Sequence, residues 1–185
     1  MGRRRRPAGG APIRSFPPIA GPGAHTLILG SMPGAASLAA NRYYAHPRNA
    51  FWRIAGALLG FDAGAPYLAR TRALAGAGFA LWDVLQSCER SGSLDAAILG
   101  RSEVANDFDA FLRAHPGIRR IFFNGAKAEA SFRRRVLPRL EAAGAARRLR
   151  LARLPSTSPA HAGLAFERKL AAWRAILGRA SKGGT

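Results

Sequence analysis

The chain has 185 residues, and its hydrophobic content of 48% is enough to build the core of one globular domain. Lysine and arginine number 29 against 10 acidic residues, which gives a formal net charge of +19. A charge of this size predicts a polyanionic partner, with nucleic acid first and an anionic membrane second. The alternative explanation is a GC-rich genome, in which arginine replaces lysine across many proteins.

The sequence offers no apolar run near the roughly 18 to 20 residues that cross a bilayer, and no apolar segment follows Arg3–Arg6. We therefore expect an unsecreted, soluble protein without a membrane partner, cytoplasmic and nucleoid-associated in a bacterium. Cys88 is the only cysteine, which excludes an internal disulfide and any four-cysteine metal site. We expect neither a metal nor another cofactor.

The two ends of the chain differ in composition from the rest. Residues 1–22 combine four consecutive arginines with several prolines and glycines and little aromatic content, which predicts a basic disordered arm. Residues 181–185 are similarly expected to form a second disordered end. The folded domain is expected to span residues 23–180.

Between these ends, short apolar runs alternate with segments of helical spacing. The runs predict strands at Thr26–Leu29, Phe79–Leu81, Ile121–Phe123 and Leu149–Leu154. The helical segments are Phe51–Leu59, Tyr67–Ala75, Val104–Ala114, Lys127–Ala143 and Gly163–Leu177. This alternation predicts an α/β fold of three layers, α/β/α, around a short, mostly parallel four-stranded sheet.

Three of the predicted strands end at Gly30, Asn124 and Pro155, so the loops that begin there should meet at the carboxyl edge of the sheet, where such folds bind ligands. The loop Gly30–Gly34 offers backbone N–H groups with little side-chain obstruction, although it also fits an ordinary tight turn. The segment Tyr43–Trp52 gathers aromatic, amide and basic groups before a helix. Such a cluster can stack a base and read its edge.

Gly-x-x-Pro-Gly at 30–34, followed by His-Pro-x-Asn-x-Phe-Trp at 46–52, resembles the first motif region of one glycosylase superfamily. The resemblance is to the hypoxanthine-DNA and mismatch-specific branches of the uracil-DNA glycosylase superfamily. The segments 122–125 and 154–161 match its later motifs in order, so the resemblance covers roughly residues 23–178. It implies hydrolysis of the N-glycosidic bond of a flipped deaminated base in DNA, with an abasic site as product.

The resemblance also implies roles for single residues. Ser31 and Met32 lie in the loop whose backbone contacts the base, Tyr44 matches the position that stacks on it, and Asn124 matches the position that reads its polar edge. Ser156 lies in the loop that supports negative charge on the departing base. The remaining implied contacts are with DNA: a phosphate at Ser158, a wedge at Ala160 or His161, and further contacts from His46 and Arg48.

The chain departs from the family pattern at two catalytic positions. Met32 stands where many members carry an Asp or Asn that positions water, and Ser156 stands where other branches carry a His. The hypoxanthine branch suggests that Asn49 positions the water instead, which suits an oxocarbenium-like transition state. The alternative is that Asn49 caps the helix beginning at Phe51.

Other residues have plain structural explanations beside the functional ones. The structural alternative for His46 is that it orients its loop, and for His161 that it lies on the surface at a helix start. Asp83 fits a buried, hydrogen-bonded carboxylate and Asp95 a helix cap, so we expect neither to be catalytic. The arginines at 133–135, 139, 147 and 148 fit a solvated helix face or a phosphate contact.

The sequence leaves alternatives open for the function. The three lysines, Lys127, Lys169 and Lys182, lie outside the motif loops, which favours a monofunctional enzyme over one that also cleaves the strand. Uracil is favoured over hypoxanthine by a small margin, and the expected partners are DNA containing either base and abasic-site DNA, bound by a monomer. The main alternative is a catalytically weak protein that binds such DNA; a single-strand binder without a base pocket is a third.

Overall fold

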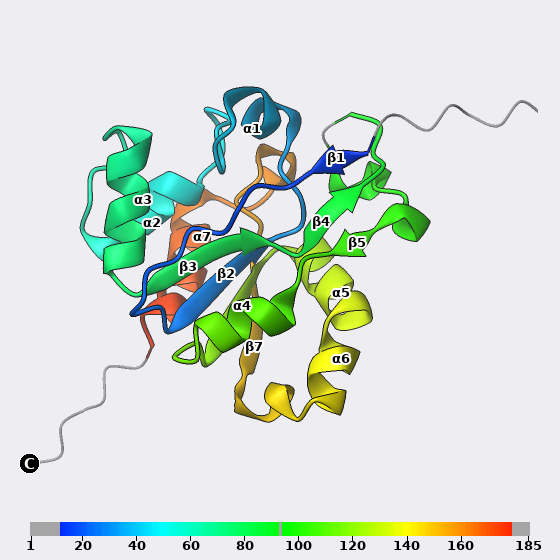
Figure 1. Cartoon of the computed structure of the whole chain (residues 1–185). Coiled ribbons are helices and arrows are strands. Elements are labelled where there is room, and N and C mark those ends of the chain that lie inside the picture. Colours follow the sequence, from blue (N-terminus) through cyan, green and yellow to red (C-terminus); the bar gives the residue numbers. More distant parts are fainter. Residues whose placement is uncertain (1–11, 93, 179–185) are drawn as a thin grey trace, which may run out of the picture.

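The computed structural model describes residues 12–92 and 94–178, which form a three-layer α/β/α fold (Figure 1). Its central sheet has the strand order β3-β2-β6-β7, and every neighbouring pair is parallel. The strands are β2 (Thr26–Gly30), β3 (Phe79–Asp83), β6 (Arg120–Asn124) and β7 (Arg150–Leu154). The predicted fold class and all four predicted strands are therefore confirmed, with boundaries shifted by one or two residues.

Helices cover both faces of the sheet, which explains why the residues of β2 and β3 are all buried. Figure 1 shows α2, α3 and α7 on one face and α4, α5 and α6 on the other. Their bounds are Phe51–Leu59 for α2, Tyr67–Gly76 for α3, Phe108–Ala114 for α4, Ala126–Arg135 for α5, Leu137–Ala142 for α6 and Phe166–Trp173 for α7. A further short helix, α1 (Ala35–Ala40), follows the first motif loop and was not predicted.

Two predicted helices are interrupted, for identifiable reasons. The helix predicted from Val104 begins at Phe108, because residues 104–105 form a strand, β5, and Asp107 caps the helix by accepting a hydrogen bond from the Ala110 N–H. The helix predicted over 127–143 is split into α5 and α6. Pro138 lies in the first turn of α6, where its missing N–H is tolerated, whereas inside a continuous helix it would remove a hydrogen bond.

A small antiparallel sheet, absent from the prediction, lies beside the main one. It has the order β1-β4-β5, formed by Ile13–Arg14, Leu85–Cys88 and Val104–Ala105.

The segment 12–22 belongs to the fold, so the predicted boundary of a disordered arm at residue 22 is wrong. β1 pairs with β4, and Ile19 exchanges backbone hydrogen bonds of 2.9 and 2.8 Å with Leu81. The carbonyl of Phe16 accepts hydrogen bonds from the Trp82 indole and the Tyr43 hydroxyl. Apolar side chains in this segment thus find partners that composition alone did not reveal. Residues 1–11 and the predicted loose end at 181–185 lie outside the described residues.

A buried carboxylate, Glu103, ties the small sheet to α5. Its side chain is fully buried, and its oxygens accept hydrogen bonds from Lys127, at 2.6 Å, and from Arg134. Burial alone raises the pKa of this carboxyl, but the hydrogen bonds and charges of Lys127 and Arg134 outweigh it and hold the pKa below the ordinary value. The folded state therefore prefers the ionised form.

We expect Glu103→Gln to lower the free energy of unfolding by about 2 kcal/mol at neutral pH, because charge-assisted hydrogen bonds become neutral ones at a buried site. The contribution of Glu103 should be present above the ordinary glutamate pKa and lost as the pH falls through the lower folded value. Urea unfolding at several pH values measures both effects. Glu129→Gln, which weakens the i,i+4 pair with the half-exposed Arg133, is the control and should cost less than about 1 kcal/mol. Equal losses in the two variants would contradict this account.

Candidate active site

The carboxyl ends of all four parallel strands meet at one edge of the sheet, as predicted for the motif loops. Gly30 pairs in register with Asp83, and Asn124 pairs in register with Leu154. The strand β3 thus brings a residue to this edge, Asp83, that the sequence analysis had set aside. The sequence did carry a signal for it, because Phe79–Leu81 is predicted as a strand and Asp83 lies two residues beyond Leu81.

Asn124 connects three motif loops through its side-chain amide. Its Nδ2 donates to the Tyr44 hydroxyl at 3.0 Å and to Thr157 Oγ1 at 2.9 Å, and its Oδ1 accepts from the Thr157 N–H at 2.9 Å. Thr157 is buried, and its carbonyl accepts the Ala50 N–H at 3.0 Å. Both amide hydrogens of Asn124 are engaged within the protein, so one lone pair of Oδ1 remains for another partner.

Thr157 was missed as a site residue, although the sequence analysis quoted the loop around it. Its role depends on contacts with Asn124 and Ala50, which lie 33 and 107 positions earlier in the chain. No local pattern encodes such contacts.

Tyr44 is held from two directions and adopts an unusual backbone conformation. Its ring stacks on that of Phe51, with centroids 4.1 Å apart and an interplanar angle of 26°, and the side chain remains partly exposed. Its φ of +53° is rare for a bulky residue and costs on the order of 1 to 3 kcal/mol. The neighbouring Tyr43 is buried in the core, and its hydroxyl donates to the Phe16 carbonyl.

Asn49 uses one side-chain atom in local structure. Its Oδ1 accepts the Phe51 N–H at 3.0 Å in a turn that leads into α2, whereas the cap position itself is held by Ala50, which makes no side-chain cap bond. Asn49 is partly exposed, and its Nδ2 has no hydrogen-bond partner among the described residues. The arrangement fixes the orientation of the amide while leaving a donor and an acceptor lone pair available.

The first loop is packed closely against the sheet edge. Ser31 and Met32 are both buried, and the carbonyls of Gly30 and Ser31 accept the N–H groups of Val84 and Leu85. A Cβ at Gly30 would lie 2.4 Å from Asp83 Oδ1, so only glycine fits there.

The last loop is shaped by its own hydroxyls. Ser156 Oγ accepts the Ser158 N–H, and Ser158 Oγ accepts the Ala160 N–H, each at 3.2 Å. Ala160 and His161 are exposed. The loop lines a cavity of about 570 Å³ together with residues from the start of α5 and from α7.

Helix α7 anchors this loop at two points. Lys169, buried on α7, donates from Nζ to the His161 carbonyl at 2.8 Å, and the Trp173 indole donates to the Pro155 carbonyl at 2.9 Å. Burial lowers the pKa of the Lys169 amine. Lys169 also lines the cavity, so a lysine does lie beside a motif loop, contrary to the impression given by the sequence order.

His46 and Arg48 lie in the turn between Tyr44 and Asn49. His46 Nδ1 accepts the Arg48 N–H at 3.1 Å, and the His46 carbonyl accepts the Asn49 N–H at 2.8 Å. His46 therefore does orient this turn. The Arg48 side chain is exposed.

Asp83 is a carboxyl group placed where ionisation is unfavourable. Burial raises its pKa to about 8, with a further contribution from Asp95, while Arg90 opposes the shift. Its Oδ2 is buried and has no hydrogen-bond partner among the residues that the structure describes, unlike the hydrogen-bonded carboxylate expected from the sequence. Asp95 is partly buried, and its pKa is raised by burial although a hydrogen bond with Ser31 lowers it. Burial thus disfavours ionisation of two acids near the carboxyl edge of the sheet.

Asp83→Asn should flatten the pH dependence of stability. A raised pKa means that the folded state keeps a proton that the unfolded state releases, so the free energy of unfolding should fall as the pH rises from about 4 to about 8. Asparagine cannot ionise, so the variant should gain stability relative to the unsubstituted protein toward pH 8. Denaturant unfolding across this range measures the slopes. Asp62→Asn, at an exposed turn, is the control. If stability depended on pH in Asp83→Asn as steeply as in the unsubstituted protein, the raised pKa of Asp83 would be contradicted.

Comparison with known proteins places this geometry in context. The sequence profile of the uracil DNA glycosylase superfamily matches residues 17–177. A hypoxanthine DNA glycosylase from Methanosarcina barkeri is 36% identical over 116 residues, which cover 62% of this chain and 72% of the relative. A protein of the same name from Methanosarcina acetivorans is 37% identical over the same shares of the two chains.

One solved structure has the same fold. It is the solution NMR structure of a candidate uracil DNA glycosylase from Methanosarcina acetivorans, with a TM-score of 0.71 and 30% sequence identity. The match covers 90% of this chain and 99% of that one.

Proposed function

Because the chain belongs to the uracil DNA glycosylase superfamily, we propose that it hydrolyses the N-glycosidic bond of hypoxanthine in DNA, with uracil as a second substrate, and leaves an abasic site. The observation that carries the proposal is the network of Tyr44, Asn124 and Thr157, which joins three motif loops at the carboxyl edge of the sheet. The sequence alone leans toward uracil. The names of the two relatives from Methanosarcina shift the balance to hypoxanthine.

Tyr44 is the residue we propose to stack on the flipped base. Its ring already stacks on Phe51, and the hydrogen bond from Asn124 to its hydroxyl fixes the ring further. A ring that is immobilised before binding loses little entropy when the base arrives. The strained φ of Tyr44 supports this role, since strain of this kind persists where surrounding contacts enforce it and gathers at functional sites.

Asn124 is proposed to read the polar edge of the base, with Ser31 and Met32 contributing backbone contacts. The amide can do this with the free lone pair of Oδ1 or by exchanging its bond with the Tyr44 hydroxyl for one with the base. Either hypoxanthine or uracil presents a ring N–H to such an acceptor. Asn124 therefore serves both substrates without deciding between them.

Asn49 is proposed to position the attacking water. Its Oδ1 is held by the Phe51 N–H, which aims the amide, and its Nδ2 can hold the water oxygen. Glycosidic cleavage passes through an oxocarbenium-like transition state, so a positioned water suffices where a strong base is absent. Met32 cannot position the water itself, because its thioether can neither donate a proton nor serve as a base.

The departing base carries negative charge, which we propose that the surrounding residues stabilise. Ser156, whose hydroxyl hydrogen is left over after Oγ accepts the Ser158 N–H, is proposed to donate to the base. Asp83, with a pKa of about 8, is mainly neutral at physiological pH, so it does not repel that charge. An ionised aspartate at this place would oppose the reaction.

The DNA backbone is proposed to lie across the exposed parts of the same loops. Arg48 and His46 would meet phosphates beside the flipped nucleotide, Ser158 would bond a phosphate, and Ala160 or His161 would enter the base stack. Most of these contacts do not involve the base, so we expect abasic DNA to bind well as product.

We propose a monofunctional enzyme, although Lys169 lies beside the last loop. Its amine is buried and donates to the His161 carbonyl, an arrangement in which it supports the loop. Borohydride reduction during turnover on a labelled oligonucleotide would reveal a covalent Schiff base. Absence of a trapped complex is the expected result.

Incubation with duplexes containing a single inosine or a single uracil, followed by alkaline cleavage, tests the proposed activity directly. Strand cleavage after alkali, with the inosine duplex cut faster, is expected. Tight binding of either duplex without cleavage would instead support a catalytically weak protein, which the departures at Met32 and Ser156 make the second candidate function.

Asn49→Ala should lower the single-turnover excision rate roughly 100-fold, about 3 kcal/mol, if the amide positions the water. Because Asn49 also holds the start of α2, the same change should cost about 1 kcal/mol of stability. The two effects need separation by a second variant.

Asn49→Ser provides that separation, since a serine hydroxyl can still accept an N–H two residues further on but cannot reach as far as the amide. We expect its melting temperature to stay close to that of the unsubstituted protein and its excision rate to fall as far as that of Asn49→Ala. A serine variant with the original rate would remove Asn49 from the chemistry and leave it as a cap.

A further inference from the structure

A basic cleft lies at the amino edge of the sheet, opposite to the candidate active site. It has a volume of about 580 Å³ and is lined by His25, Gly117, Arg119, Arg120, Arg148 and Arg150. Four arginines therefore contribute to the lining of one depression. We call this feature the amino-edge cleft.

These four arginines lack carboxylate partners within the described part of the chain. The ion pairs of the protein involve other cations, namely Lys127, Arg133, Arg134, Arg135, Arg139 and Arg153. Arg119 and Arg148 donate only to backbone carbonyls, those of Pro116 and Leu112. The described residues therefore supply no carboxylate that neutralises the charge of the cleft.

The pairing of two strands places two of these positive charges beside each other. Arg120 and Arg150 are register partners on the neighbouring strands β6 and β7. Like charges at paired positions destabilise a sheet, by an amount comparable to what an opposite pair would contribute. A bound anion would remove that cost.

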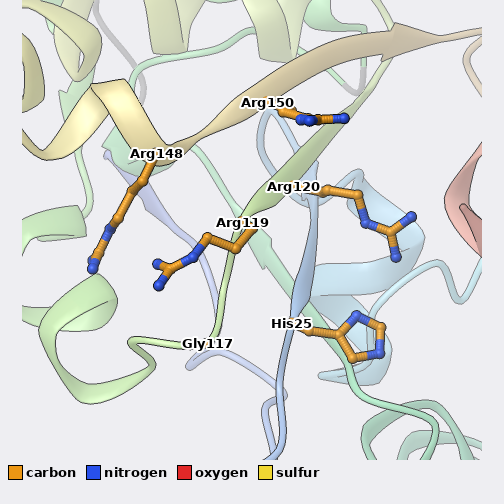
Figure 2. A pocket seen from close by; sticks show the side chains of 6 residues that line it. All are labelled: His25, Gly117, Arg119, Arg120, Arg148 and Arg150. Atoms are coloured by element: carbon orange, nitrogen blue, oxygen red, sulfur yellow. The ribbon is translucent and has the colours of Figure 1, made fainter.

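The side chains point in two directions. Figure 2 shows Arg119 and Arg148 on one side of the strands, and Arg120, Arg150 and His25 on the other. A single small anion cannot reach both groups, whereas a polymer of phosphates can follow the edge from one to the other. Guanidinium groups, always charged and able to bond phosphate through two N–H groups, suit such a ligand.

The cleft and the candidate active site lie at opposite ends of the same strands. Arg120 begins the strand that Asn124 ends, so their backbones are separated by four steps of a β-strand, roughly 13 Å. We expect a duplex bound on the motif loops at the carboxyl edge to leave the arginines of the amino-edge cleft free for a second segment.

We propose that the amino-edge cleft binds the phosphate backbone of a second DNA segment, so that one protein molecule can hold two duplexes at once. The proposal rests on the proposed function only in taking DNA as the polyanion. Holding a second segment would let the enzyme pass between DNA segments without full release, since phosphate contacts of this kind carry no sequence preference.

The test counts duplexes bound to one protein molecule. Full-length protein is mixed with an excess of an undamaged duplex of about 12 base pairs, slightly more than one helical turn, at about 50 mM salt. Sedimentation velocity should show complexes of one protein with two duplexes. Transfer between donor- and acceptor-labelled duplexes should report the same bridging.

Three double variants, each losing two positive charges, assign the second duplex to a surface. Arg119→Gln with Arg120→Gln, and Arg148→Gln with Arg150→Gln, should each weaken binding of the second duplex on the order of tenfold, since each removes two phosphate contacts. The control, Arg72→Gln with Arg101→Gln, removes two exposed arginines elsewhere and should bridge as the unsubstituted protein does. Excision of a single lesion should be unchanged in the cleft variants.

Several outcomes would overturn the proposal. These are a complex with one duplex only, bridging that survives both cleft variants, and an equal loss in the control. Displacement of the second duplex by millimolar inorganic phosphate as readily as by DNA would indicate a small-anion site instead. Because the probe carries no lesion, failure of excision would leave these results interpretable.

Discussion

The hydrogen bonds of the Asn124 side chain are the constraint on which the arrangement of the carboxyl edge depends. One amide reaches the hydroxyl of Tyr44 and both the N–H and the hydroxyl of Thr157, while Thr157 accepts the N–H that precedes α2. These contacts join the ends of β6 and β7 to the turn after α1. They also explain how Tyr44 can persist at a positive φ, because neighbouring contacts on both the ring and the hydroxyl enforce it.

The positive charge is distributed unevenly over the described surface. On the helical face formed by α5 and α6, Arg133, Arg134 and Arg139 have acidic partners in Glu129, Glu103 and Asp109. This stretch, which the sequence offered as a phosphate contact, is largely compensated. Four of the arginines without an acidic partner among the described residues line one depression at the amino edge of the sheet. Net charge alone therefore indicates that the protein favours polyanions. The positions of the few acidic residues determine where positive charge is left available to bind them.

How much the sequence could predict depended on the range of the interactions involved. The strands and α2 were predictable because apolar periodicity is local, and the meeting of Gly30, Asn124 and Pro155 followed from the rule for parallel sheets. Residues 12–22 were misjudged because their partners lie far along the chain: the Phe16 carbonyl accepts a hydrogen bond from the Trp82 indole, and Phe16 and Ile19 pack against the core.

The same limit applies to the site. The hydrogen bonds of Thr157 and the raised pKa of Asp83 arise from burial and from contacts between distant segments, which neither residue type nor spacing reports. The dual position of Asn49, at a helix start and beside the motif loops, could be listed as two alternatives from sequence; the structure shows that its Oδ1 already serves the helix, while Nδ2 stays available.

Helix α7 lends the last motif loop its rigidity. Lys169 and Trp173 lie four residues apart, hence on the same side of the helix, and they hold the loop at His161 and at Pro155. Helix α7 therefore holds the loop at both ends. The ring of Trp173 also packs edge-to-face against Phe51, on which the ring of Tyr44 stacks. The surface expected to press on the DNA backbone and the surface expected to receive the base share a single mechanical support, so the two cannot shift independently.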